Sequence, residues 1–148
     1  MQKLDLPVIR TAGGLVIDHI NRILFIFKDG KWDLPKGIIE DDENPLSTAI
    51  KETSEETGLS ATSLSCVCEL IPTHHLSKYK KNSYLKVTEW FLLTCDNNKQ
   101  FFSPQKEEGI EHCEWIPLWD LNKVLSQTSS RTRYLLEFWL KYCKNITK

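Results

Sequence analysis

Apolar residues gather in short runs that polar stretches separate. Near the start of the chain, Val8 to Ile17 and Ile23 to Phe27 are rich in aliphatic residues and flank the polar stretch His19 to Arg22. This pattern predicts a β-hairpin. Similar runs predict three further strands, at Leu64 to Ile71, Tyr84 to Thr94 and Gly109 to Ile116, with the polar stretch His74 to Ser83 separating the first two.

One segment between these runs has the spacing of an amphipathic helix. Asn44 and Pro45 supply a capping side chain and a first-turn proline, and Gly58 supplies a stop. The helix is therefore predicted to cover about Pro45 to Thr57. Its core-facing stripe is expected to consist of Leu46, Ala49, Ile50, Thr53 and Thr57.

The last third of the chain predicts two more helices. Trp119 to Leu125 suggests a short one, and Arg131 to Lys144 suggests a longer one with Ser129 or Ser130 as its cap. Strands first, a helix among them and helices last indicate an α+β fold. The 148 residues are enough for one domain, 1–148, with a core that needs no disulfide. Apolar surface on the longer helix comes from Leu135, Leu136, Phe138, Trp139 and Tyr142.

Charge and composition exclude several classes of protein. The formal net charge of −1 gives no overall attraction to nucleic acid or to a membrane, so DNA binding is not expected. No apolar run approaches 18 residues, and Met1 to Arg10 lacks the anatomy of a signal peptide. A cytoplasmic protein is therefore expected.

The five cysteines do not indicate a metal site. Their number is odd and they contain no C-x-x-C pair, so zinc binding is not expected. Cys66 and Cys68 alternate on a predicted strand and should point to one face. Reduced, buried thiols are the expectation.

Three carboxylates lie close together on the predicted helix. Glu52, Glu55 and Glu56 share an arc roughly 100° wide beside the apolar stripe. Like charges at this spacing repel, which favours a bound cation, and hard oxygen ligands suit Mg²⁺ or Mn²⁺. A solvated charged face is the alternative.

The window from Gly37 to Leu59 strengthens the cation interpretation. It resembles the Nudix box, G-x5-E-x7-R-E-U-x-E-E-x-G-U with U aliphatic, although Lys51 replaces the arginine and Thr53 replaces an aliphatic residue. Lysine lacks the planar fork that grips a carboxylate in two places. The matching residues are Gly37, Glu43, Glu52, Glu55, Glu56, Gly58 and Leu59.

Two segments before the box extend the resemblance. Arg10 to Ile17 looks like the opening strand of the Nudix family, in which small residues let the backbone run close to the substrate. Trp32 to Gly37, W-D-L-P-K-G, resembles the lead-in of diadenosine polyphosphate hydrolases and related bacterial enzymes. The resemblance implies an α/β/α sandwich around a mixed sheet, with the Nudix loop and helix attached.

The resemblance also implies roles for individual residues. The carbonyl of Gly37 and the carboxylates of Glu55 and Glu56 would ligate the metal, while Glu52 would ligate it or act as the base on a metal-bound water. Glu43 and Lys51 would form a pair that braces the loop against the helix. A further catalytic glutamate is expected before the last strand; Glu108 is the candidate, with Glu107 and Glu111 as rivals.

Substrate-binding residues are less clearly marked. Arg10 and Lys36 stand beside the motifs and are candidates for phosphate contacts, with exposed cations as the alternative. The stretch Lys78 to Lys86, with Lys81 and Tyr84, would clamp a polyphosphate and stack a base, unless it is a solvated loop. His74 and His75 are expected to be structural or exposed, or one of them could serve as an auxiliary acid or base.

The resemblance implies a Mg²⁺- or Mn²⁺-dependent Nudix hydrolase of nucleoside diphosphate-linked substrates. A dinucleoside polyphosphate such as diadenosine tetraphosphate is the first choice. The alternatives are nucleoside triphosphate pyrophosphohydrolase and diphosphoinositol polyphosphate phosphohydrolase. A non-catalytic nucleotide sensor on a Nudix scaffold is disfavoured because the box glutamates are present. The expected partner is a small-molecule nucleotide or polyphosphate substrate, and the chain is expected to be a monomer or a homodimer.

Overall fold

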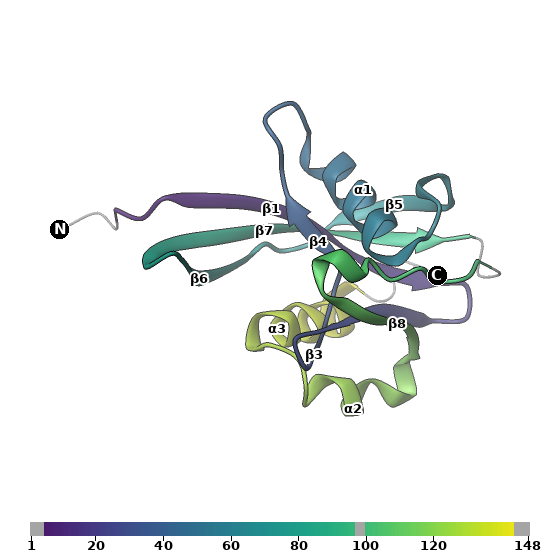
Figure 1. Cartoon of the computed structure of the whole chain (residues 1–148). Coiled ribbons are helices and arrows are strands. Elements are labelled where there is room, and N and C mark those ends of the chain that lie inside the picture. The colour runs from purple at the N-terminus through teal and green to yellow at the C-terminus, as the bar shows by residue number, and fades with distance from the viewer. Residues whose placement is uncertain (1–4, 97–99, 144–148) are drawn as a thin grey trace.

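A single mixed sheet forms the centre of the protein (Figure 1). The computed structural model describes residues 5–96 and 100–143. In them β1 and β7 run parallel, from Val8 beside Leu85 to Asp18 beside Cys95, and the other strand pairs are antiparallel. The strands are β1 (Val8–Asp18), β2 (Arg22–Lys28), β3 (Lys31–Asp33), β4 (Lys36–Ile38), β5 (Leu64–Glu69), β6 (Thr73–Tyr79), β7 (Asn82–Cys95) and β8 (Ile110–Pro117).

Helices cover both faces of this sheet (Figure 1). The helices are α1 (Pro45–Thr57), α2 (Leu121–Leu125) and α3 (Ser130–Phe138), with a π-helix at Trp139–Cys143 and 3₁₀ turns at Ala61–Ser63, Lys106–Glu108 and Leu118–Asp120. α1 lies on one face, and α2 and α3 lie on the other. The predicted α+β class and the α/β/α sandwich are therefore confirmed.

The caps of α1 and α3 are those that the sequence predicts. The Asn44 side chain accepts a hydrogen bond from the Ser47 amide, and Gly58 ends α1 in the left-handed conformation. Ser129 caps α3 by accepting from the Thr132 amide. α3 ends at Phe138 and continues as the π-helix, while Lys144, the last residue of the predicted helix, lies outside the described residues.

Each face of the sheet carries its own apolar cluster. Ala12 and Val16 of β1 join the cluster beneath α1, and Leu15 and Ile17 join the cluster on the side of α2 and α3. β1 is thus apolar on both faces, which explains its nearly continuous run of apolar residues. Within the described part of the chain, no helix is both long enough and apolar enough to cross a membrane.

Three strands were not predicted. β3 and β4 have three residues each, which is too short for a periodic signal. β6 occupies most of the polar stretch that was predicted to separate two strands, and it pairs with β7 through a tight turn at Lys80 and Lys81. Its side chains are mostly exposed, so the strand lacks the apolar alternation of a buried one.

Small residues in β1 admit other parts of the chain. A β-carbon at Gly13 would lie 2.5 Å from the Pro35 carbonyl oxygen, and one at Gly14 would lie 3.0 Å from Thr53 Oγ1. The first distance is closer than real β-carbons approach, and the Gly14 position would also lie 2.8 Å from Leu93 Cδ1. The glycines therefore let β4 and α1 pack against β1, a role that the sequence had assigned to the approach of substrate.

The cysteines are all free, but they are not all buried. Cys95 and Cys113 are buried, whereas Cys66 is exposed. A register shift in β5 pairs Cys66 with Leu93 and Cys68 with Leu92. Because adjacent residues of β7 point to opposite faces, the expectation that Cys66 and Cys68 share a face is wrong.

Candidate active site

The loop before α1 is fitted closely to the helix. A β-carbon at Gly37 would overlap the carboxyl group of Glu52, so only glycine leaves room for this side chain. Gly37 lies in β4, which pairs with Ala12 of β1, and the central sheet therefore holds the position that Glu52 packs against. The first glycine and the first helix glutamate of the box are in direct contact.

Glu56 is buried, with 7% of its surface exposed. Its Oε2 atom accepts a hydrogen bond of 3.0 Å from the Lys36 amide. Burial raises the pKa of Glu56 to about 8, although the Lys36 amide and ammonium oppose the shift. Without a cation beside it, this carboxyl is therefore mostly protonated at neutral pH.

The burial of Glu56 was not predicted, but the sequence contains a signal for it. Glu56 follows Thr53 by three residues and Ala49 by seven, which is the spacing of a buried helix stripe. Both of those residues are fully buried. The buried face of α1 is thus wider than the predicted stripe of five residues.

Five glutamates surround one cavity of about 390 Å³, the carboxylate cavity. Burial, followed by repulsion from Glu55, raises the pKa of Glu52. Glu40, which the sequence did not indicate, also lines this cavity. The full lining is Lys28, Lys36, Gly37, Ile38, Glu40, Glu52, Glu55, Glu56, Lys86, Gln105 and Glu108.

Glu108 reaches the carboxylate cavity because its loop is bonded to the end of α1. The Ser103 amide donates to the Thr57 carbonyl at 2.8 Å, and the Gln105 amide donates to the Glu56 carbonyl at 3.1 Å. Its rivals, Glu107 and Glu111, do not line this cavity. The catalytic role of Glu108 remains a prediction.

The predicted contact between Glu43 and Lys51 is present. Lys51 Nζ lies 2.6 Å from Glu43 Oε2 and 3.8 Å from Glu52 Oε1. Glu43 also accepts hydrogen bonds from the Glu40 amide and the Thr48 hydroxyl, so it ties the loop to the first turns of α1. Whether this pair supports catalysis stays a prediction.

The residues around the carboxylate cavity fit a divalent cation only in part. Among the described residues, no three Asp, Glu, His or Cys side chains are close enough together to form a ready metal-binding group. However, Mg²⁺ commonly uses one or two carboxylates and completes its shell with water and substrate phosphates. Glu56 is buried and has no cationic side-chain partner at bonding distance. Its carboxylate is therefore the ligand that would gain most from a bound cation.

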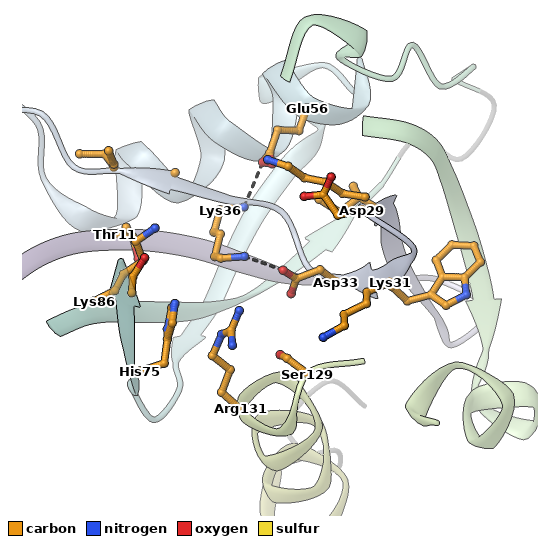
Figure 2. A pocket seen from close by; sticks show the side chains of 16 residues that line it. Thr11, Asp29, Lys31, Asp33, Lys36, Glu56, His75, Lys86, Ser129 and Arg131 are labelled. Atoms are coloured by element: carbon orange, nitrogen blue, oxygen red, sulfur yellow. Dashed lines mark hydrogen bonds and ion pairs between the residues drawn. The ribbon is translucent and has the colours of Figure 1, made fainter. Parts of the chain in front are cut away.

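A second cavity of about 440 Å³, the cationic cavity (Figure 2), shares part of its lining with the first. The two share Lys28, Lys36 and Lys86, together with Glu56. Lys36 Nζ is paired with Asp33 at 2.6 Å. The full lining is Thr11, Ile26, Lys28, Asp29, Lys31, Trp32, Asp33, Lys36, Gly37, Ile38, Glu56, His75, Ser77, Lys86, Ser129 and Arg131.

Asp33 lines this cavity and contacts both Lys36 and Thr132. Burial alone would raise its pKa, but the Lys36 ammonium and several hydrogen bonds hold the pKa below its ordinary value. One of those bonds, of 2.9 Å, comes from the Thr132 hydroxyl. Asp33 therefore stays ionised and links β3 to α3.

Of the predicted substrate-binding residues, Lys36 lines these two cavities, and so does Lys86 at the end of the stretch Lys78 to Lys86. Arg10 is paired with Glu89 at 2.6 Å, and neither Lys81 nor Tyr84 contributes to either lining. Sequence reasoning missed Lys28, Lys31 and Arg131. Arg131 is far from Lys28 and Lys31 in the sequence, so no local spacing could have grouped the three.

His75 lies among these cations without a charge of its own. Burial, followed by repulsion from Arg131 and Lys86, lowers its pKa to about 4. Its Nδ1 atom is buried and has no hydrogen-bond partner in the described residues. A polar atom left in this state is satisfied when a ligand or water donates to it.

Comparisons with known proteins agree with this geometry. Residues 8–138 match the NUDIX domain family. The chain is 31% identical over 140 residues to the dihydroneopterin triphosphate diphosphatase of Haemophilus influenzae, covering 86% of this chain and 82% of that protein. It is 28% identical over 96 residues to an 8-oxo-dGTP diphosphatase of Proteus vulgaris, covering 59% of this chain and 82% of that protein.

Solved structures show the same fold. A binary complex of a C. elegans Ap4A hydrolase superposes with a TM-score of 0.70 at 18% identity, covering 93% of this chain and 98% of that one. The family matches nearly the whole described chain, and two diphosphatases resemble it in sequence. Together these similarities indicate the chemistry of the protein. The protein therefore belongs to the NUDIX domain family and is a hydrolase of phosphoanhydride bonds in nucleotides.

Proposed function

We propose that this Nudix hydrolase cleaves dinucleoside polyphosphates, with diadenosine tetraphosphate as the first substrate to test, and that it uses Mg²⁺ or Mn²⁺. The observation that carries the proposal is the cationic cavity, which adjoins the carboxylate cavity and shares Lys28 and Lys86 with it. A long polyphosphate needs such a tract of positive charge beyond the point of cleavage.

The charges in the cationic cavity favour a polyanion. Lys28, Lys31, Lys86 and Arg131 have no ion pair within the described residues, whereas the charge of Lys36 is balanced by Asp33. Burial, followed by repulsion from Lys36, lowers the pKa of Lys86, which is the sign of cations held together without enough anions. Bound phosphate groups would relieve this repulsion.

The carboxylates have a separate role at the reacting phosphate. Glu56 and Glu55 would hold the cation together with Glu52 and the carbonyl of Gly37. When bound, Mg²⁺ or Mn²⁺ neutralises charge on the phosphate oxygens and acidifies water. Glu52, whose pKa is raised by burial and by repulsion from Glu55, would accept the proton of the attacking water, and Glu108, which lines the same cavity, is the alternative acceptor.

A second candidate is hydrolysis of a triphosphate with release of diphosphate. It is favoured by the similarity to the dihydroneopterin triphosphate diphosphatase, which extends over 86% of the chain. Such a substrate has a ring system at one end only. The two candidates therefore differ in whether a second ring system follows the polyphosphate.

A substrate panel tests the proposal. Diadenosine tetraphosphate, ATP, dihydroneopterin triphosphate and a diphosphoinositol polyphosphate would be compared with Mg²⁺ and with Mn²⁺, and kcat/KM measured for each. The proposal expects diadenosine tetraphosphate to give the highest value, and a higher value for dihydroneopterin triphosphate would reverse the order of the candidates. Reaction in ¹⁸O-labelled water, followed by mass spectrometry of the products, identifies the phosphorus that water attacks.

A further inference from the structure

A third cavity lies on the far side of His75 and Arg131. It has a volume of about 470 Å³ and is lined by the start of β6 and one face of α3, with Pro72, His74, Ser130 and Tyr134 among its residues. His75 and Arg131 line both this outer cavity and the cationic cavity. They form the wall between the two.

The three cavities follow one another. The carboxylate cavity shares Lys28, Lys86 and Glu56 with the cationic cavity, which shares His75 and Arg131 with the outer cavity. Figure 2 shows Glu56 at one end of the cationic cavity and the side chains of His75 and Arg131 at the other. A ligand that begins at the glutamates and crosses the cations therefore meets the outer cavity next.

The character of the lining changes along this path. The shared lining of the first two cavities contains Lys28, Lys36 and Lys86, whereas Arg131 is the one cation among the described residues of the outer cavity. His75 beside it is uncharged at neutral pH because its pKa is about 4. The outer cavity is therefore less suited to further phosphates than to an uncharged group.

Tyr134 gives the outer cavity an aromatic surface. Its side chain is 59% exposed, and it lies one helical turn from Ser130, so both residues face the same side of α3. His74 supplies a second ring on the opposite element. Exposed rings beside polar donors are the usual surface for stacking a base, because every base has a flat aromatic face.

We propose that the outer cavity binds the second nucleoside of a dinucleoside polyphosphate, with the base against Tyr134 and the last phosphate against Arg131. This inference rests on the proposed function and extends it, because it makes Tyr134 a determinant of specificity for substrates that carry a nucleoside at both ends. Mononucleotides would occupy the first two cavities only.

The test compares two ligands with the same phosphate chain. Diadenosine tetraphosphate has a second adenosine, and adenosine 5′-tetraphosphate lacks it. Tyr134→Ala is expected to raise KM for the dinucleotide at least about fivefold, as lost base stacking predicts, and to leave kcat/KM for the mononucleotide within about twofold. Arg131→Ala is expected to weaken both substrates, because each places a phosphate in the cationic cavity.

Tyr142→Ala is the matched control. Tyr142 is 63% exposed and lies on the π-helix, and it lines none of the three cavities. This variant should leave both substrates unchanged. If Tyr134→Ala changes neither substrate, or changes both equally, the outer cavity is not the second nucleoside site.

A binding measurement separates this inference from the proposed function. If the wild-type protein hydrolyses neither compound with Mg²⁺ or Mn²⁺, the proposed function fails, and the inference is then judged by fluorescence titration without divalent ions. Tighter binding of the dinucleotide that disappears in Tyr134→Ala would support the site. Equal affinity of the wild-type protein for the two compounds would overturn it.

Discussion

The carboxyl group of Glu52 packs directly on the α-carbon of Gly37. The contact joins β4 to α1, and it leaves no space for any side chain at position 37. We expect Gly37→Ala to displace Glu52 and to lower kcat by about a hundredfold, since a shift of about 1 Å in a catalytic group has an effect of this size. Steady-state kinetics with diadenosine tetraphosphate would measure the loss.

A double-mutant cycle distinguishes this effect from general damage to the loop. If Gly37→Ala acts through Glu52, it should cost little more activity when Glu52→Gln is already present. Additive losses in the double variant would show that residue 37 acts by another route.

Glu56→Gln should separate activity from stability. The substitution keeps an oxygen for the Lys36 amide but removes the carboxylate that would hold the cation, so turnover should fall at least about a hundredfold. Because the pKa of Glu56 is raised to about 8, its ionised form is unfavourable in the folded protein, and the metal-free variant should be more stable than wild type above pH 8. Thermal unfolding in EDTA and kinetics with Mg²⁺ provide the two measurements.

Glu55→Gln is the companion variant on the exposed side of the helix. It should also lose activity without the gain in stability. Unchanged turnover in either folded variant would refute its assignment as a metal ligand.

Lys51→Arg should keep or increase activity. Lys51 Nζ lies 2.6 Å from Glu43 but 3.8 Å from Glu52, and a guanidinium group can donate to both carboxylates at once. Lys51→Met should lower kcat by about tenfold, because it leaves Glu43 and Glu52 without a shared cation. A tenfold loss in Lys51→Arg would instead indicate that the site is built around lysine.

Thr53→Val should stabilise the protein. Thr53 is fully buried and its hydroxyl has no hydrogen-bond partner within the described residues, so valine removes an unsatisfied polar atom without changing the volume. The expected gain is about 1 kcal/mol in the free energy of unfolding, measured by urea denaturation.

Thr57→Val is the control on the same helix. Thr57 is equally buried, but its hydroxyl donates to the Thr53 carbonyl at 2.6 Å. Thr57→Val should therefore lower the free energy of unfolding. A loss of stability in Thr53→Val would mean that its hydroxyl is satisfied.

The pKa of His75 gives stability a pH dependence in acid. The ring has a pKa of about 4 in the folded protein and an ordinary value of 6.5 when unfolded. A depressed histidine pKa contributes stability above pH 6.5, and this contribution is lost as the pH falls toward 4, because the unfolded chain takes up the proton first. The difference in unfolding free energy between wild type and His75→Gln should change across this window.

Nuclear magnetic resonance titration measures the same ring directly. Arg131, Lys86 and Lys36 lower the pKa of His75 after burial, while Asp33 raises it. Inorganic tripolyphosphate bound among these cations should therefore shift the pKa upward. A pKa near 6.5 in the free protein would contradict the proposed surroundings of His75.

Local signals in the sequence were sufficient for α1 and for the class of fold. Asn44, Pro45 and Gly58 mark the ends of α1, and these ends depend on hydrogen bonds within a few residues. β6 was missed because an exposed strand needs no apolar alternation. Its partner β7 determines its conformation.

The composition of the site could be predicted only where it depends on one segment. The box placed Glu52, Glu55 and Glu56 together because they lie on one helix. Lys86 and Arg131 meet only after β7 and α3 have packed on the sheet, and this meeting has no trace in local spacing. The phosphate-binding surface thus required the fold, whereas the carboxylates did not.

The parallel alignment of β1 with β7 also constrains how the protein is made. Val8 lies beside Leu85 and Asp18 beside Cys95, so a ribosome must synthesise the chain as far as β7 before β1 acquires its parallel partner. Until then β1 presents an open edge that can pair with other nascent chains. Closing so long a loop is slow compared with forming α1, and this step is expected to limit the folding rate.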